Sequence, residues 1–488
     1  MNDMSPNSEI LTDADPLAVA SVPVRTILDK ALAGVEISQS EGACLFAAQG
    51  ADLPAIYQVA DILRQRANGD KVSFVVNRNI NFTNVCYMGC RFCGFAKRSD
   101  EEGAEWLELE QIVARAQEAW DRGGTEVCIQ GGLHPKMDGT YYFDIVRALK
   151  AALPDMHIHA FSPFEIWYGA SKTKMSYRAF LTELKAAGLD TIPGTAAEIL
   201  DTEIRQQLTK NKLSTERWVE IVRTSHEVGI PTTATIMYGH IDGPDHWAAH
   251  IALLRDIQRD TGGFTELVPL SFVHTESPLY TNNPDKVRPG PTDDEVDKMH
   301  AVSRIMLAGY IDNIQVSWTK LGAERAQQLL SRGVNDLGGT LMNESISRSA
   351  GADHGQELTA FELVQMIRAA GRVPVQRRTN YSILDIYDDH DPKPLAPLVE
   401  RKASQAPLDF LDMFPAQGEP LEAAHIMLAI RGDAAMIFSP STHLRLKAGA
   451  TADLFQADTP LGHRVSLQQK RLTAIFHTPL ICEPERSK

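Results

Sequence analysis

The chain has 488 residues, of which 43% are hydrophobic and 23% are charged, and its formal net charge at pH 7 is −15. This composition can bury a sizeable core, and the length predicts one large domain with appendages. The negative charge argues against binding a nucleic acid backbone, because that affinity depends on lysine and arginine. We therefore expect the ligands to be small molecules.

The N-terminal residues show no targeting signal. The sequence MNDMSPNSEILTDADPLAVA is polar and acidic, and it lacks the basic start and apolar centre of a signal peptide. No apolar run reaches the roughly 20 residues that span a bilayer. We expect a disordered N-terminus over residues 1–25, no membrane partner and a cytoplasmic location, where thiols stay reduced.

A helical segment is expected over residues 26–71, and β-rich segments then alternate with amphipathic helices from residue 72 to residue 387. This alternation is typical of βα units around a parallel sheet. The apolar residues that recur at helical spacing after the first strand are Leu109, Ile112, Val113, Ala116 and Trp120. The candidate strands are residues 72–81, 126–130, 156–161, 190–193, 232–238, 265–272, 313–317 and 336–339. Eight such strands close a complete barrel, so the predicted fold class is α/β, with a (β/α)8 barrel.

The residues after the predicted barrel have a different composition. Residues 388–409 are rich in proline and charge, which is typical of a linker. Residues 410–488 form a C-terminal extension, whose patterns indicate short strands or one helix and a hairpin. We assign no function to this extension.

The stretch NFTNVCYMGCRFCGFAKR contains Cys86, Cys90 and Cys93 in a C-x3-C-x2-C spacing. Three such thiolates can bind three irons of a 4Fe–4S cluster and leave the fourth iron open to chelate a small molecule. This layout resembles that of radical S-adenosylmethionine (SAM) enzymes, in which the open iron holds the methionine end of SAM. The resemblance implies that one electron splits SAM into methionine and a 5′-deoxyadenosyl radical. It also implies that Phe92 packs near the adenine.

Three other interpretations of these cysteines fit less well. A structural zinc site needs four ligands, and Cys44, Cys128 and Cys482 are isolated in the sequence. Cysteines at this low density do not make a disulfide framework. An ordinary ferredoxin would supply a fourth cysteine at family spacing, and none lies nearby.

Polar and glycine-rich segments follow several predicted strands, where barrel enzymes carry their active sites. Gly131 and Gly132 would let main-chain carbonyls bind the amino group of the cofactor, although a tight turn is the alternative. Glu165 and Glu198 would accept hydrogen bonds from ribose hydroxyls or substrate amines, or else stabilise a helix N-terminus. We assign Glu165 to catalysis and Glu198 to cofactor binding.

Four histidines are candidates for proton transfer, because histidine titrates close to neutral pH. They are His134, His159, His240 and His274. Each also fits a structural role, and we expect at most two of them to act. Our candidate for catalysis is His240, which follows the strand predicted at residues 232–238.

The motifs resemble one family within this superfamily. In chain order they are NINFTNVCYMGCRFCGFAKR, IQGGLHP, HAFSPFE, GLDTIPGTAAEIL, TTATIMYGH, TGGFTELVPLSF and GVNDLGGTLMNESISRSAG. Together they look like the tyrosine-using subunit of the deazaflavin FO synthase, whose relatives are the radical enzymes of the futalosine route to menaquinone. The resemblance covers about residues 27–387.

The resemblance implies transfer of the 4-hydroxybenzyl group of L-tyrosine to C5 of 5-amino-6-(D-ribitylamino)uracil. The deoxyadenosyl radical takes a hydrogen from the tyrosine amine, the Cα–Cβ bond breaks, and the remainder leaves as 2-iminoacetate. Because the chain has one cysteine triplet, it looks like a separate first subunit, with a second radical enzyme acting on its product to give FO. An electron donor such as ferredoxin or flavodoxin is implied as well.

The same resemblance suggests where the substrates bind. Tyrosine brings a carboxylate, for which Arg348 or Arg98 offers bidentate donors. The uracil and ribityl groups need polar partners, and the candidates at predicted strand ends are Gln130, Thr235, Asn335 and Asp336. One departure from the commonest superfamily pattern is Leu133, which stands where a glutamate is usual, so main-chain contacts would bind the methionine amine.

Other functions stay open. A radical enzyme of the menaquinone route would act on a nucleoside-like molecule and not on tyrosine. An iron–sulfur electron carrier or scaffold would do no chemistry, and it would not need glycine-rich loops around its cluster. An assembly or maturation factor is the third alternative.

Overall fold

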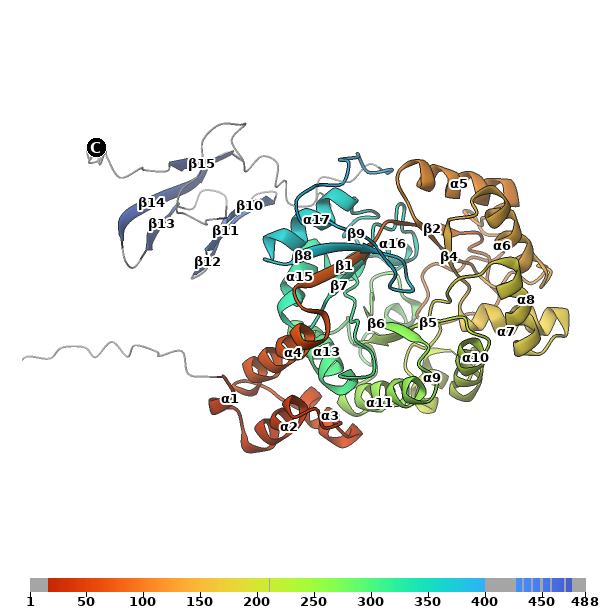
Figure 1. The fold of residues 1–488 in the computed structure, drawn as a ribbon, viewed down its shortest axis with the longest axis horizontal. Coiled ribbons are helices and arrows are strands. Elements are labelled where there is room, and N and C mark those ends of the chain that lie inside the picture. The colour runs from red at the N-terminus through yellow and green to blue at the C-terminus, as the bar shows by residue number, and fades with distance from the viewer. Residues whose placement is uncertain are drawn as a thin grey trace, which may run out of the picture. The chain divides into compact units, whose positions relative to one another are not determined.

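The computed structural model describes residues 16–209 and 211–399 with their side chains, and the backbone of six strands between residues 427 and 475. The chain divides into two compact units, Met1–Glu400 and Arg401–Lys488. The first unit holds the helices and the parallel strands (Figure 1). No helix in the described part combines the length and the apolar character needed to cross a membrane.

The first unit begins with helices that lie outside the barrel: α1 (Pro16–Val19), α2 (Val22–Leu32), α3 (Gln39–Ala47) and α4 (Asp52–Asn68). The expectation of disorder over residues 1–25 is therefore wrong from Pro16 onward. Ser21 donates to the Asp52 carboxylate through both its backbone N–H, at 2.6 Å, and its hydroxyl, at 2.9 Å. These bonds fix the start of α2 on α4, while Ile27 and Leu28 are buried in the core. Residues 1–15 lie outside the described part.

The parallel strands of the first unit are β1 (Lys71–Val75), β2 (Asn77–Asn81), β3 (Glu126–Gln130), β4 (His157–Ala160), β5 (Thr232–Tyr238), β6 (Phe264–Ser271) and β7 (Asp336–Gly339). Two short segments, residues 191–192 and 314–315, complete the ring through parallel bridges. Residues 191–192 bridge to His159 on β4 and Thr232 on β5, and residues 314–315 bridge to Leu267 on β6 and Asp336 on β7. The ladder then returns from β7 to β1 through Ser73–Asp336 and Val75–Gly339. The predicted eight-stranded barrel is thereby confirmed, with β1 and β2 as one interrupted strand.

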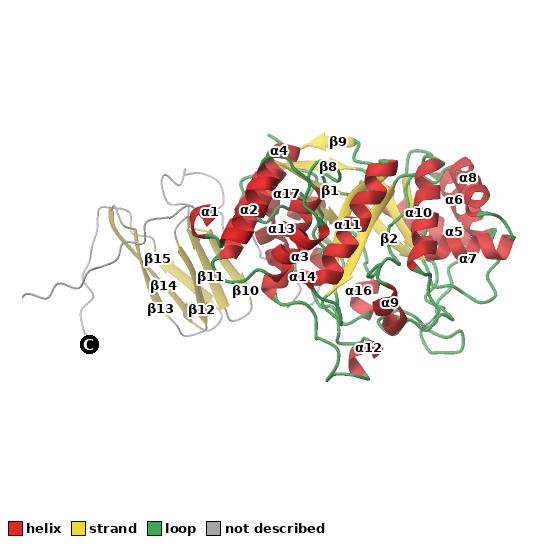
Figure 2. Cartoon of the chain, turned by 90° about the horizontal axis from the view of Figure 1, so that it is seen from below, coloured by secondary structure: helices red, strands yellow, loops and turns green. Residues whose placement is uncertain are grey.

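Helices connect the strands and surround them (Figure 1). They are α5 (Leu109–Asp121), α6 (Tyr141–Ala152), α7 (Pro163–Thr173), α8 (Tyr177–Ala187), α9 (Thr202–Leu208), α10 (Thr215–Glu227), α11 (Pro244–Thr261), α12 (Pro278–Thr281), α13 (Asp293–Leu307), α14 (Trp318–Leu321), α15 (Ala323–Gln328), η1 (Leu329–Ser331), α16 (Ile346–Ser349) and α17 (Ala360–Ala369). In α5 the expected apolar stripe buries Ile112 and Ala116, whereas Trp120 at its end remains 38% exposed. Figure 2 shows α9, α12 and α16 at one end of the barrel and β8 (Val373–Arg377) with β9 (Ile383–Ile386) at the other.

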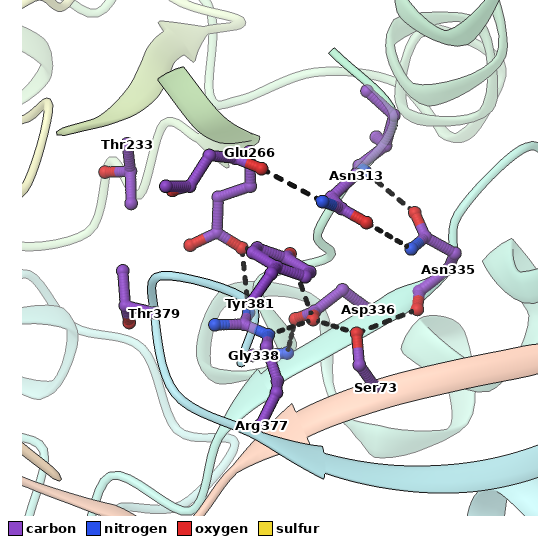
Figure 3. A network of polar contacts seen from close by, with 12 residues as sticks. Ser73, Thr233, Glu266, Asn313, Asn335, Asp336, Gly338, Arg377, Thr379 and Tyr381 are labelled. Atoms are coloured by element: carbon purple, nitrogen blue, oxygen red, sulfur yellow. Dashed lines mark hydrogen bonds and ion pairs between the residues drawn. The ribbon is translucent and has the colours of Figure 1, made fainter. Parts of the chain in front are cut away.

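A network of polar contacts lies near the amino ends of β6 and β7, and it includes Arg377 from β8 and Tyr381 from the segment that joins β8 to β9 (Figure 3). β8 pairs with β1 in parallel, and β9 returns antiparallel to β8. Arg377 donates to Asp336 at 2.7 Å and to Glu266 at 2.8 Å, and the Tyr381 hydroxyl donates to Glu266 at 2.7 Å. Burial raises the pKa of Glu266 to about 7, although Arg377 opposes this shift. Glu266 and Asp336 lie near the amino ends of their strands, so this network is at the amino end of the barrel. The carboxyl end carries the loops that follow the strands.

The segment predicted as a linker begins by contacting the barrel. Leu398 donates its backbone N–H to Glu357 at 2.5 Å, and Arg122 donates to the carbonyl of Ala396 at 2.5 Å. The linker prediction is therefore wrong for residues 388–399, because they belong to the first unit and Ala396 and Leu398 bond to its other residues. Residues 400–409 lie outside the described part.

The C-terminal unit consists of strands in its described part. β10 (Met427–Arg431), β11 (Ala434–Ser439) and β12 (Thr442–Lys447) form one antiparallel sheet. β13 (Thr451–Gln456), β14 (Thr459–Gln468) and β15 (Arg471–Ile475) form a second antiparallel sheet. This arrangement agrees with the short strands expected from the sequence.

Replacing Arg377 by Met should lower the free energy of unfolding by about 3–5 kcal/mol, because it leaves Glu266 and Asp336 buried without their cation. The loss should be larger at pH 8 than at pH 6. A buried glutamate with a raised pKa is protonated at the lower pH and ionised at the higher one, so stability falls as pH rises through that pKa. Arg178, which pairs with Glu227 on the surface, is the matched control, and Arg178→Met should cost less than about 1 kcal/mol. Denaturant titrations at both pH values measure this, and equal losses for the two variants would contradict it.

Truncation after Glu400 should leave the thermal unfolding midpoint of the first unit unchanged, because the cut follows the last contacts described for that unit. Truncation after Asp388 should lower the midpoint, since it removes the bonds made by Ala396 and Leu398. Scanning calorimetry of the two truncated chains compares them directly. If the chain truncated after Glu400 had a lower midpoint than the full chain, the second unit would be shown to support the barrel.

Candidate functional site

A cavity of about 270 Å³ lies at the carboxyl end of the barrel. Each of the eight strand positions contributes lining residues, from the strand itself or from the loop that follows it. One representative from each, in order, is Cys86, Gly131, Glu165, Glu198, Met237, Phe272, Lys320 and Ile346. This is the consequence of a closed parallel barrel, in which every strand ends on the same side. The cavity therefore gathers side chains from Asn81 to Ala350, far apart in the sequence.

Cys86, Cys90 and Cys93 all line this cavity. The loop that carries them is held by backbone bonds from Cys86 to the carbonyl of Lys97 and from Cys93 to the carbonyl of Cys90. In the described part of the chain, no three His, Cys, Asp or Glu side chains could hold one metal ion together. A 4Fe–4S cluster does not require this, because each thiolate binds a different iron. The three converging thiols therefore fit an iron–sulfur cluster.

Gly131 and Gly132 bring the loop after β3 against the cysteine loop. A Cβ atom on Gly132 would lie 2.4 Å from the carbonyl oxygen of Val85 and 3.0 Å from the Cβ of Cys86. A Cβ atom on Gly131 would lie 2.5 Å from the ring of Phe82. Both glycines are thus required for close packing, and both line the cavity. Binding of a cofactor amino group by this loop stays a prediction.

Glu165 lines the cavity and also begins α7. Its Oε2 accepts from the backbone N–H and the hydroxyl of Ser162, both at 2.7 Å, in a capping box. Its Oε1 accepts from the N–H of Gly131 at 2.9 Å. Burial raises the pKa of Glu165 to about 7, although these three bonds oppose the shift. The helix-terminal alternative is confirmed, and the carboxylate ties β4 and its helix to the glycine loop.

Glu198 pairs with Lys212, a residue that the sequence did not single out. Lys212 Nζ lies 2.5 Å from Glu198 Oε1 and 4.9 Å from the centroid of the Phe92 ring. Burial alone would lower the pKa of Lys212, but Glu198 and the Cys90 thiolate raise it above its ordinary value. The other carboxylate oxygen, Glu198 Oε2, is buried and lies 3.8 Å from the Arg205 guanidinium, but it has no hydrogen-bond partner in the described part. Phe92 and Glu198, both predicted cofactor residues, therefore lie together beside the cysteines.

His240 and Arg348 lie outside the cavity lining. His240 is fully buried, and its ring contacts the carbonyl of Met237 at 3.1 Å and the N–H of Ile241 at 2.7 Å. Burial lowers its pKa. Arg348 is exposed and donates to Gln356 at 2.5 Å. The geometry thus gives no support to the catalytic role predicted for His240 or to the tyrosine-binding role predicted for Arg348.

The remaining candidates divide in the same way. Gln130 and Thr235 line the cavity, whereas Asn335 and Asp336 belong to the network at the amino end (Figure 3). Arg98 does not line the cavity, nor do His134, His159 and His274. Besides Lys212, the sequence missed one further charged residue of the lining, Lys320, because an isolated lysine in a four-residue helix has no motif around it.

Two family models match the chain. Residues 80–254 match the radical SAM superfamily, and residues 261–390 match the CofH/MqnC C-terminal region. The FO synthase of Mycobacterium leprae is 54% identical over 346 residues, which are 71% of this chain and 40% of that protein. The FO synthase of Streptomyces coelicolor is 50% identical, again over 71% of this chain and 40% of that protein. The chain thus spans about 40% of the length of these relatives.

Solved structures share the fold at low sequence identity. Methylornithine synthase (PylB) superposes with a TM-score of 0.58 at 18% identity, covering 72% of this chain and 98% of that one. HydG, a maturase of the [FeFe]-hydrogenase, superposes with a TM-score of 0.58 at 16% identity, covering 74% and 77%. These likenesses support the barrel described above.

Gly132→Ala should lower the iron and sulfide content of the purified protein severalfold, because the added Cβ pushes against the backbone beside Cys86. Gly243→Ala is the matched control, since its Cβ would meet nothing within 4 Å and its φ of −164° suits any residue. Iron, sulfide and visible absorbance after anaerobic reconstitution measure the effect. Equal cluster content in the two variants would show that the contact between the loops does not matter.

A methanogen relative is matched over almost the whole of its own length. The 5-amino-6-(D-ribitylamino)uracil–L-tyrosine 4-hydroxyphenyl transferase of Methanothermobacter thermautotrophicus is 46% identical over 357 residues, which are 73% of this chain and 96% of that protein. The aligned length is close to that of the barrel unit, which carries the three cysteines. This chain therefore belongs to the radical SAM family that includes the FO synthases and this methanogen transferase.

Proposed function

We propose that this protein joins the 4-hydroxybenzyl group of L-tyrosine to C5 of 5-amino-6-(D-ribitylamino)uracil, a step in making the deazaflavin FO. The co-products would be 2-iminoacetate, 5′-deoxyadenosine and methionine. The observation that carries the proposal is the similarity to the methanogen transferase, which is 46% identical to this chain over 96% of the transferase's length. The cavity supports it, because it opens beside three cysteines at the carboxyl end of the barrel.

Cys86, Cys90 and Cys93 would bind three irons of a 4Fe–4S cluster, and SAM would bind beside it. When bound, a reduced cluster of this kind supplies the electron that splits SAM. Glu198 Oε2 is a buried acceptor without a hydrogen-bond partner in the described part, so it suits a ribose hydroxyl. Lys212 holds the other oxygen of Glu198 and thereby fixes the carboxylate beside the Phe92 ring.

The chain's own contribution to the chemistry is confinement. The cavity wall includes the apolar side chains of Leu133, Phe164, Met237, Leu270 and Phe272. Such a wall excludes water and holds the substrate in contact with a reactive carbon, which prevents side reactions. Glu165 stabilises this wall through its bonds to the loops after β3 and β4.

The chain would depend on other proteins. The match covers only 40% of the relatives named FO synthase, so the rest of the route to FO would need another protein. We propose that this other protein is a second radical enzyme, which converts the product to FO. The first step also needs a reductant, for which ferredoxin or flavodoxin is suitable. All of this would take place in the cytoplasm, where an oxygen-sensitive cluster is kept reduced.

A menaquinone-route enzyme is the second candidate, because the matched C-terminal model covers both kinds of protein, CofH and MqnC. The methanogen relative favours the tyrosine enzyme. A carrier or scaffold would need neither a closed barrel nor a cavity lined from all eight strand positions. A maturation factor is favoured by no specific observation, since the maturase HydG is only 16% identical.

The proposal is tested by anaerobic incubation of the reconstituted protein with dithionite, SAM, tyrosine and the diaminouracil. In deuterated water the exchangeable tyrosine amine should place deuterium in 5′-deoxyadenosine, whereas carbon-deuterated tyrosine in ordinary water should place none. The product mass should equal that of the hydroxybenzyl adduct. Consumption of a futalosine compound with tyrosine left inert would refute the proposed substrates.

Single cysteine variants separate the cluster from the substrates. Cys90→Ala should abolish 5′-deoxyadenosine formation, because one iron loses its thiolate. Cys128→Ala is the matched control, since Cys128 lies in β3 and does not line the cavity. Equal loss of iron in both variants would contradict the assignment of Cys86, Cys90 and Cys93.

A further inference from the structure

The cavity lining contains two cationic side chains, Lys212 and Lys320, and their surroundings differ. Lys212 is already neutralised by Glu198 at 2.5 Å. The ammonium group of Lys320 donates to the hydroxyl of Ser347 at 3.0 Å. Within residues 16–209 and 211–399, no carboxylate oxygen lies within 4.0 Å of it. Lys320 is therefore the cation in this cavity that still lacks an anionic partner.

Contacts on both sides hold Lys320 in place. It lies in α14, where the preceding Trp318 donates its indole N–H to the carbonyl of Gly339 at 2.9 Å. Ser347 belongs to α16, and its backbone N–H donates to the buried carboxylate of Glu344 at 2.8 Å. The ammonium group thus stands between the loops that follow the last two strand positions, in an orientation set by the fold.

The electrostatics of Lys320 favour a bound anion. Burial lowers its pKa, and the Glu344 carboxylate opposes this shift from beyond ion-pair distance. A partly desolvated ammonium group without a carboxylate partner is unfavourable until an anion reaches it. The neighbouring lining residues Leu270, Phe272 and Ile346 are apolar, so an anion attached to an aromatic ring would fit beside them.

We infer that Lys320 binds the carboxylate of the tyrosine substrate. This inference depends on the proposed function. Of the two proposed substrates, tyrosine carries an ionised acid and the diaminouracil does not, while the carboxylate of SAM would be held by the open iron. The earlier candidate, Arg348, lies one residue beyond Ser347 but is exposed and bonded to Gln356. Lys320 is accordingly a specificity-determining residue, and it discriminates tyrosine from amines that lack the carboxylate.

The test is Lys320→Met, assayed for adduct formation with each substrate varied in turn. The KM for tyrosine should rise about ten- to hundredfold, as expected for loss of a charge-assisted hydrogen bond. The KM for the diaminouracil should not change. Inhibition by 3-(4-hydroxyphenyl)propanoate, which keeps the carboxylate, should weaken by the same factor, and inhibition by tyramine, which lacks it, should stay as in the wild type.

Lys136→Met is the matched control, because Lys136 is exposed on the same end of the barrel and does not line the cavity. It removes the same charge and should leave both KM values unchanged. Lys320→Arg keeps a cation and should retain most of the preference for tyrosine over tyramine. Cluster absorbance and SAM cleavage without tyrosine report whether each variant is folded.

An unchanged tyrosine KM in Lys320→Met would overturn the inference, and so would a rise in the diaminouracil KM alone. If Lys320→Met does not load its cluster, the inference is tested by inhibitor assays on the wild-type protein. Inhibition by 3-(4-hydroxyphenyl)propanoate that is no stronger than inhibition by 4-ethylphenol overturns the inference. Inhibition that is at least about tenfold stronger supports it. Failure of the proposed function is a different result, because the wild type itself would then form no adduct from tyrosine.

Discussion

The barrel depends on one buried carboxylate at the seam where its last strand meets its first. Asp336 opens β7, and its Oδ2 accepts from Ser73 on β1 and from Arg377 at the end of β8. Its Oδ1 accepts from the N–H of Gly338 at 2.7 Å. A buried carboxylate is stable only with such partners, and here they come from both sides of the seam. Because all the barrel strands are parallel, closing this seam arranges their eight carboxyl ends in one ring, and the cavity lies there.

Around that cavity the charges are distributed unevenly. The loops of the first four strand positions supply the cysteines, Glu165 and the Glu198–Lys212 pair, and in the pair both charges are neutralised. The loops of the last four supply mainly apolar groups and the cation Lys320. A side that holds paired charges thus faces a side whose cation, Lys320, has no carboxylate oxygen within 4.0 Å among the described residues. This polarity favours one orientation of a molecule that has an acid at one end and a neutral ring at the other.

The sequence predicted the barrel well because each parallel strand is a local run of β-forming residues, which needs no knowledge of distant contacts. The cysteine triplet was predictable for the same reason. Lys212 and Lys320 were not, since a single lysine gains its meaning from the carboxylate or hydroxyl that the fold brings to it. Arg348 and His240 have residue types that suit the chemistry, but the fold places both outside the cavity lining. Arg348 is exposed and donates to Gln356, and the turn after β5 uses both ring nitrogens of His240. The helices at Pro16 and Val22 were missed because a bond to distant Asp52 holds them.

The polar network at the amino end of the barrel has a kinetic consequence. Arg377 and Tyr381 occupy that end, so ligands exchange with solvent at the carboxyl end, through the mouth formed by the loops. Ligands that share one entrance must bind in order: the ligand that lies deepest binds first, and it can leave only after the others. Turnover would then follow a compulsory order of binding and release.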